Sequence, residues 1–145
     1  MRWPALVRLF GVLLLSSCIP VAGAAAPQAR PAPRAVTLGE PFTLAAGATV
    51  RVGPERTGVT FKAVLADSRC PTDVQCIQAG EAVVRVTVAR PGQPAETVEI
   101  QTTPSLDHVT AAGYTLTLTR LLPVPNTKRP TRMSDYRATF ILAQP

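Results

Sequence analysis

Hydrophobic and polar residues alternate along several short stretches of this chain, and the alternation predicts β-strands. The clearest stretch is 82–89, where Val84, Val86 and Val88 share one face and Arg85 and Thr87 lie between them. A period of two is typical of a strand with one buried face. Six further stretches have strand-like composition, and they span residues 41–44, 49–52, 59–65, 97–101, 114–121 and 136–142.

The spacing of these stretches predicts an all-β domain. Turn-forming residues separate them at intervals of roughly 10 residues. Residues 90–94 (RPGQP) are expected to form a hairpin turn, and residues 103–112 a loop. Prolines interrupt the longer helix candidates after the N-terminal region. About seven short strands indicate an antiparallel β-sandwich of immunoglobulin-like type, and a small β-barrel is the alternative.

The N-terminal region has the pattern of an export signal. Arg2 and Arg8 precede a short apolar run that ends near residue 15. Such a run is too short to remain as a membrane-spanning helix, and a basic segment before it is typical of a signal peptide. We therefore expect residues 1–17 to be removed on export.

Two processing sites compete in this region. Leu-Ser-Ser-Cys, ending at Cys18, resembles the bacterial lipobox, whose cysteine is acylated. Residues 22–24 (AGA) instead fit ordinary signal cleavage near Ala24, which would release a soluble periplasmic or secreted protein. We favour lipidation of Cys18, because the apolar run before it has the normal length of a signal-peptide h-region. Two acyl chains would then anchor the protein stably. Cys18 is followed by Ile19 and not by aspartate. By resemblance to the sorting rules of bacterial lipoproteins, this favours an outer-membrane lipoprotein that faces the periplasm.

The predicted precursor has three parts in all. An Ala/Pro-rich tether over 18–35 follows the signal peptide, and the β-sandwich domain occupies 36–145. The chain carries a formal charge of +6, and loss of two arginines with the signal leaves +4. This mild charge and the predicted export argue against nucleic acid as a partner. Expected partners are the membrane, through the lipid anchor, and an envelope protein or cell-wall component.

The two remaining cysteines, Cys70 and Cys76, are six positions apart. This spacing is neither a C-x-x-C redox motif nor half of a zinc-binding pair. In an oxidising compartment we expect them to form a local disulfide, which stabilises the fold by roughly 2 kcal/mol. No metal site and no cofactor are predicted. A metal-handling protein with reduced Cys70 and Cys76 is an alternative.

The segment around the cysteines, residues 67–82, is the candidate binding surface. It is polar and lies between two apolar strands. Each polar residue also has a structural interpretation, because such side chains accept backbone hydrogen bonds in turns. The candidate binding residues are Asp67, Arg69, Asp73, Gln78 and Glu81.

A catalytic function has one candidate residue, His108, which is the only histidine. It follows Asp107 directly, and adjacent residues on an extended chain point in opposite directions, so we expect Asp107 not to orient it. No G-x-S-x-G motif supplies a nucleophile. A small envelope hydrolase that uses His108 is therefore an alternative, and no catalytic residue is assigned.

The cysteine segment DSRCPTDVQCIQAGEA resembles the pattern D-S-R-C-P-x-x-V-x-C-x-W-A-G-x-A. That pattern is typical of a family of small, uncharacterised bacterial exported proteins, many of them classed as lipoproteins. The resemblance extends to residues 113–118 with the following L-P-x-P, and to residues 135–138. It implies export and a small β domain but no activity. Gln78 occupies the position at which the family pattern has tryptophan.

Together these features predict a non-catalytic binding or structural module of the cell envelope.

Overall fold

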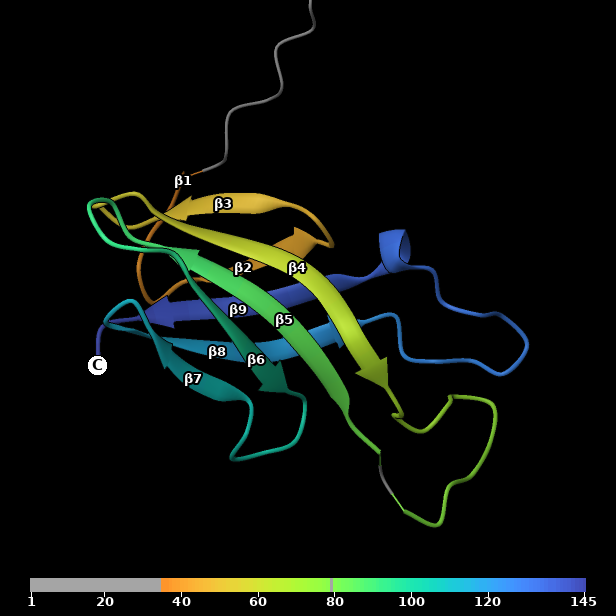
Figure 1. Ribbon diagram of the computed structural model, residues 1–145. Helices are drawn as coiled ribbons and strands as arrows, with labels where there is room; N and C mark the ends of the chain where they lie inside the picture. The colour runs from red at the N-terminus through yellow and green to blue at the C-terminus, as the bar shows by residue number, and fades with distance from the viewer. Residues whose placement is uncertain (1–34, 79) are drawn as a thin grey trace, which may run out of the picture. The chain divides into compact units, whose positions relative to one another are not determined.

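The computed structural model describes residues 35–78 and 80–145 as a sandwich of two β-sheets (Figure 1). The predicted signal peptide, Cys18 and nearly all of the predicted tether lie outside the described residues. The strands are β1 (Ala35–Val36), β2 (Pro41–Ala45), β3 (Thr49–Val52), β4 (Thr57–Asp67), β5 (Ala82–Ala89), β6 (Glu96–Gln101), β7 (His108–Ala111), β8 (Tyr114–Leu122) and β9 (Arg137–Ala143). A short 3-10 helix, η1 (Met133–Asp135), precedes β9.

One sheet has the strand order β1-β3-β4-β5-β6, and the other has the order β2-β9-β8-β7. All neighbouring strands are antiparallel except β1 and β3, which are parallel. Consecutive strands from β3 to β6 are neighbours, as are those from β7 to β9. The predicted antiparallel β-sandwich is confirmed, and the β-barrel alternative is wrong, because the strands form two separate sheets.

The described residues contain nine strands, two more than predicted. Both additional strands are short and lie at a sheet edge. β1 has two residues, and β7 has four within the segment expected to be a loop. Strands this short carry too few alternating positions to be recognised from sequence.

The predicted alternation places the core residues correctly. Val84, Val86 and Val88 of β5 are completely buried, and so are the inward-facing residues of β9 from Ala138 onward. Phe140 of β9 joins the two layers at the centre. Its ring centroid lies 6.0 Å from that of Phe61 in β4 and 6.1 Å from that of Phe42 in β2. Edge and tilted packing at these distances is favourable for aromatic rings.

A β-bulge changes the alternation in β8. The register with β9 shifts between Leu118 and Arg120, so that both Leu118 and Leu121 are buried although they are three positions apart. An extra residue in one strand rotates the following side chains to the other face. The bulge thus places Leu121 in the core.

The sandwich has two different ends. At one end lie β1, the C-terminus and three tight turns (Figure 1). Here Arg90 donates two hydrogen bonds to Glu55, at 2.7 and 2.9 Å, and stacks on the ring of Tyr114. At the other end lie the longer connections 68–81, 102–107 and 123–136, together called the loop end below (Figure 1).

Thr57, at the start of β4, leads to a stability prediction. It is completely buried, and its Oγ1 has no hydrogen-bond partner in the described part of the chain. A buried hydroxyl without a partner is destabilising, whereas valine has nearly the same shape. We expect Thr57→Val to raise the free energy of unfolding by about 1 kcal/mol in urea denaturation.

Thr60→Val is the matched control, because the Thr60 hydroxyl lies 2.8 Å from that of Thr49 in a hydrogen bond. This variant should show no gain. Equal effects of the two substitutions would contradict the prediction.

Candidate functional site

Cys70 and Cys76 form the predicted disulfide, with an S–S distance of 2.16 Å. The connection that contains it, residues 68–81, runs from β4 to β5 and is called the disulfide loop below. Hydrogen bonds between Ser68 and Glu81 join the two ends of this loop, called its neck below. The Ser68 amide donates to the Glu81 carbonyl at 2.8 Å, and the Ser68 hydroxyl donates to the same oxygen at 2.9 Å. The disulfide loop is therefore held at its neck as well as at its cysteines.

Gly80 is needed for the closure of this neck. A Cβ atom at this position would lie only 1.7 Å from the carbonyl oxygen of Ser68. No other residue can be accommodated without movement of the backbone. The glycine seen in the sequence is thus explained by the close approach of two chain segments.

Asp67 and Arg69 form an ion pair beneath the loop. Arg69 Nη2 and Nε donate to the two carboxylate oxygens of Asp67, at 2.7 and 2.8 Å. The side chain of Asp67 is only 8% exposed and that of Arg69 only 14%. Arg69 also donates from Nη1 to the Leu121 carbonyl at 2.7 Å and from Nη2 to the Pro123 carbonyl at 2.8 Å. This ion pair therefore ties the disulfide loop to the end of β8.

Tyr136 completes this cluster, because its hydroxyl donates to Asp67 Oδ2 at 3.0 Å. Burial, followed by the adjacent Asp67 carboxylate, raises the pKa of Tyr136 to about 12. For Asp67 itself, burial acts to raise the pKa. Hydrogen bonds from Arg69 and Tyr136, together with the Arg69 charge, more than offset it, so the pKa of Asp67 is lowered.

Asp73 joins the disulfide loop to the segment 123–136. Its Oδ1 accepts a hydrogen bond from the Thr127 amide at 2.9 Å, and its Oδ2 accepts one from the Thr127 hydroxyl. These hydrogen bonds lower the pKa of Asp73. The Thr72 amide adds a bond to the carbonyl of Pro125 at 2.9 Å. The two loops therefore form one braced unit.

The five predicted binding residues occupy different environments. Asp67 and Arg69 point into the protein, and Asp73 binds the neighbouring loop. Glu81 accepts a hydrogen bond from the Thr103 hydroxyl at 2.7 Å. Gln78 lies on the exposed face of the disulfide loop. Four of the five side chains therefore brace the loop end, and Gln78 faces solvent.

His108 lies at the start of β7 and differs from expectation. Its Nδ1 is 3.0 Å from Asp107 Oδ1, so the expectation that these side chains point apart is wrong. Asp107 immediately precedes β7 and lies outside the strand, so its carboxylate can reach the imidazole ring of His108. Both side chains are exposed, and no hydroxyl of a described residue is hydrogen-bonded to His108. In residues 35–78 and 80–145, no three metal-ligating side chains converge.

The strongest surface feature was not predicted from the sequence. Five of the six exposed large hydrophobic residues of the described chain lie in the connections of the loop end, and the sixth, Leu65, lies two residues before the end of β4. Ile77, on the disulfide loop, is fully exposed. In the sequence, the signal for this surface feature was the presence of the apolar residues Val74 and Ile77 within a polar loop. The apolar rim consists of Leu65, Val74, Ile77, Leu106, Val124 and Met133.

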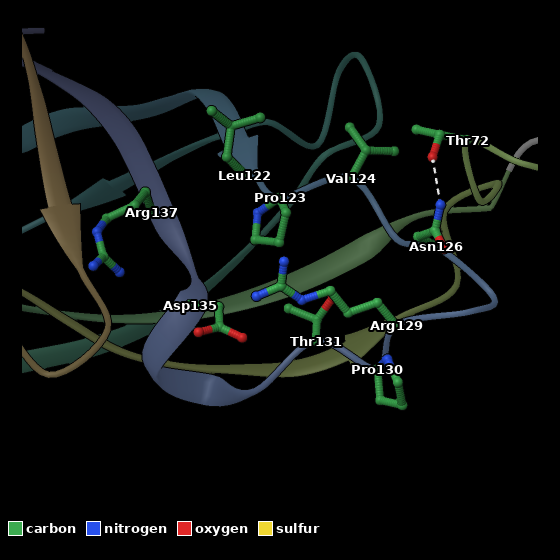
Figure 2. Close-up of a pocket in the computed structure, with 10 residues that line it drawn as sticks. All are labelled: Thr72, Leu122, Pro123, Val124, Asn126, Arg129, Pro130, Thr131, Asp135 and Arg137. Atoms are coloured by element: carbon green, nitrogen blue, oxygen red, sulfur yellow. Dashed lines mark hydrogen bonds between the residues drawn. The ribbon is translucent and has the colours of Figure 1, made fainter.

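A hollow of about 650 Å³ lies next to this rim (Figure 2). Its floor and walls come mainly from the segment between β8 and β9, with Thr72 contributed by the disulfide loop. Arg129 reaches into it from one side, and Arg137 lies on the side of β9 (Figure 2). The lining residues are Thr72, Leu122, Pro123, Val124, Asn126, Arg129, Pro130, Thr131, Asp135 and Arg137.

Comparison with protein-family models, curated proteins and solved structures finds no match to this chain. Among the described residues, no helix has the length and apolar character needed to cross a bilayer.

The Asp67 cluster leads to a prediction about pH. Because the folded-state pKa of Asp67 is lowered, its ionised form stabilises the fold above the unfolded pKa of about 3.9, and this contribution disappears as the pH falls through the folded value. We expect Asp67→Asn to lower the free energy of unfolding at pH 7 by about 2 kcal/mol in urea denaturation. The difference from wild type should shrink below pH 4.

Tyr136 provides an independent measurement on the same cluster. Its raised pKa means that its contribution is complete below about pH 10 and is lost as the pH rises through about 12. Absorbance titration near 295 nm should place its ionisation near pH 12, with Tyr136→Phe identifying the signal. In Asp67→Asn the midpoint should move part of the way toward 10. An unchanged midpoint would show that Asp67 does not act on Tyr136.

Proposed function

We propose that this protein is an exported, lipid-anchored binding module of the bacterial envelope without catalytic activity. Cys18 would carry the lipid, and residues 18–35 would form the tether. The loop end would contact an envelope protein or a cell-wall component.

The observation that carries this proposal is the gathering of exposed apolar side chains at one end of the sandwich. Soluble monomers rarely expose a contiguous apolar surface, and large exposed patches mark interaction sites. The two ends of this domain differ clearly in this respect. The loop end has the apolar rim, whereas the opposite end has tight turns and the Glu55–Arg90 ion pair.

The bracing of the loop end supports a binding role. A surface that is already ordered loses less conformational entropy when a partner binds. The disulfide, the Asp67–Arg69 pair and the Asp73–Thr127 hydrogen bonds all order this surface. β1, which follows the predicted tether, lies at the opposite end, so an anchor there would leave the loop end accessible (Figure 1).

Site-specific photo-crosslinking in cells tests the binding surface. A crosslinker at Val74 should capture a defined partner, because this side chain belongs to the apolar rim. Ile77→Ser in the same protein should reduce the captured partner at least several-fold while thermal unfolding is unchanged. A crosslinker at Gln93, in the turn between β5 and β6, is the matched control and should capture little.

Equal capture from Gln93 and Val74, or capture that is unaffected by Ile77→Ser, would overturn the proposed surface.

Cell fractionation tests the anchor. We expect wild-type protein in the membrane fraction, with an intact mass that includes acyl chains on Cys18. Cys18→Ala should move the protein to the soluble fraction or leave its signal uncleaved. A wild-type protein that begins at Ala25 and carries no lipid would overturn the anchor.

A further inference from the structure

Positive charge is concentrated in the segment that runs from the end of β8 to the start of β9. The described residues include eleven basic and nine acidic side chains. Residues 120–137 contain five of the basic residues but only one acidic residue, Asp135. The rest of the domain therefore has six basic and eight acidic residues. The five basic residues of this segment are Arg120, Lys128, Arg129, Arg132 and Arg137.

These five cations differ from Arg69, Arg85 and Arg90 in their partners. Arg69, Arg85 and Arg90 each form an ion pair with a carboxylate. None of the five cations in 120–137 does so with a described residue. Their charge is therefore available to a molecule outside this domain, and it produces a local positive potential next to the apolar rim.

Two of these arginines border the hollow beside the rim. Arg137 Nη1 donates to the carbonyls of Ser134 and Tyr136, at 2.7 and 2.8 Å, which fixes its guanidinium. The Arg129 guanidinium extends over the hollow beside Pro123 and Asp135 (Figure 2). Guanidinium groups bind carboxylates through paired N–H donors.

The one carboxylate in the hollow does not cancel this charge. Asp135 Oδ2 accepts a hydrogen bond from the Arg132 amide at 3.1 Å, at the start of η1. It forms no ion pair with Arg129 or Arg137. Two guanidiniums against one engaged carboxylate leave the hollow positive, and Lys128 lies next in sequence to Arg129.

The walls of the hollow offer an apolar contact close to these charges. Leu122, Pro123, Val124 and Pro130 line it, and the two prolines restrict the backbone. Because the guanidiniums and the apolar walls belong to one recess, a protruding chain segment can reach both. A flat bilayer surface fits a recess of this kind less well.

We infer that the hollow binds an acidic peptide segment of a partner protein. A carboxylate of the peptide would pair with Arg129 and Arg137, and a neighbouring apolar side chain would pack on Pro123 and Val124. This inference rests on the proposed binding role of the loop end and adds the chemistry of the partner.

Titration calorimetry with defined peptides tests it. The probe is a capped eight-residue peptide, Gly-Ser-Glu-Leu-Glu-Leu-Ser-Gly, and its matched control has glutamine in place of both glutamates. We expect the acidic peptide to bind the purified protein at least tenfold more tightly than the control. Affinity should fall as salt is raised from 50 to 300 mM, because exposed charges are screened.

Arg129→Gln should weaken binding of the acidic peptide at least tenfold. Lys62→Gln removes one positive charge from the exposed face of β4 and should change it less than twofold. Equal affinity for the two peptides, no binding of either, or no effect of Arg129→Gln would overturn the inference. Phosphatidylglycerol vesicles that bind through Arg129 while the peptide does not would also overturn it, in favour of a membrane surface.

Photo-crosslinking in cells separates this inference from the proposed function. If capture from Val74 persists in the Arg129→Gln protein and the peptide does not bind, the binding role stands and only the acidic segment is wrong. If capture from Val74 does not exceed capture from Gln93, the proposed function itself is wrong.

Discussion

The largely buried ion pair between Asp67 and Arg69 is the interaction on which the loop end depends. Asp67 is the last residue of β4, and Arg69 lies two residues later, directly before Cys70. Through Arg69 the pair reaches the carbonyls of Leu121 and Pro123, and through Asp67 it reaches Tyr136. One pair of side chains thus connects both sheets and two long loops.

Such a pair has a large cost of desolvation, which is offset only when its hydrogen-bonding groups are satisfied. Here the carboxylate accepts from Arg69 and Tyr136, and the guanidinium donates to two carbonyl oxygens. The disulfide cannot replace this network, because it closes a loop of only a few residues and acts locally. The ion pair sets the position of the loop, and the disulfide limits its conformations.

The consequence is a surface with two adjoining parts. Four of the six residues of the apolar rim lie on the two loops that are held by Asp67, Asp73 and the disulfide. The hollow bordered by Arg129 and Arg137, the basic hollow, lies in the segment 123–136, to which the disulfide loop is hydrogen-bonded. Thr72 of the disulfide loop contributes to its lining. A partner that contacts one part is therefore placed close to the other.

The sequence by itself determined the all-β class, the main strands, the inward-facing residues and the disulfide. These follow from local patterns: the period of two in strands such as β5, and two cysteines at short separation. The edge strands β1 and β7 were too short to carry such a pattern. Only the tertiary structure decided the roles of the polar residues, because Asp67 and Tyr136 are 69 positions apart and their bond depends on how the sheets pack. The same is true of the apolar rim and the basic hollow, since no local pattern reveals which distant loops meet at one end of a sandwich.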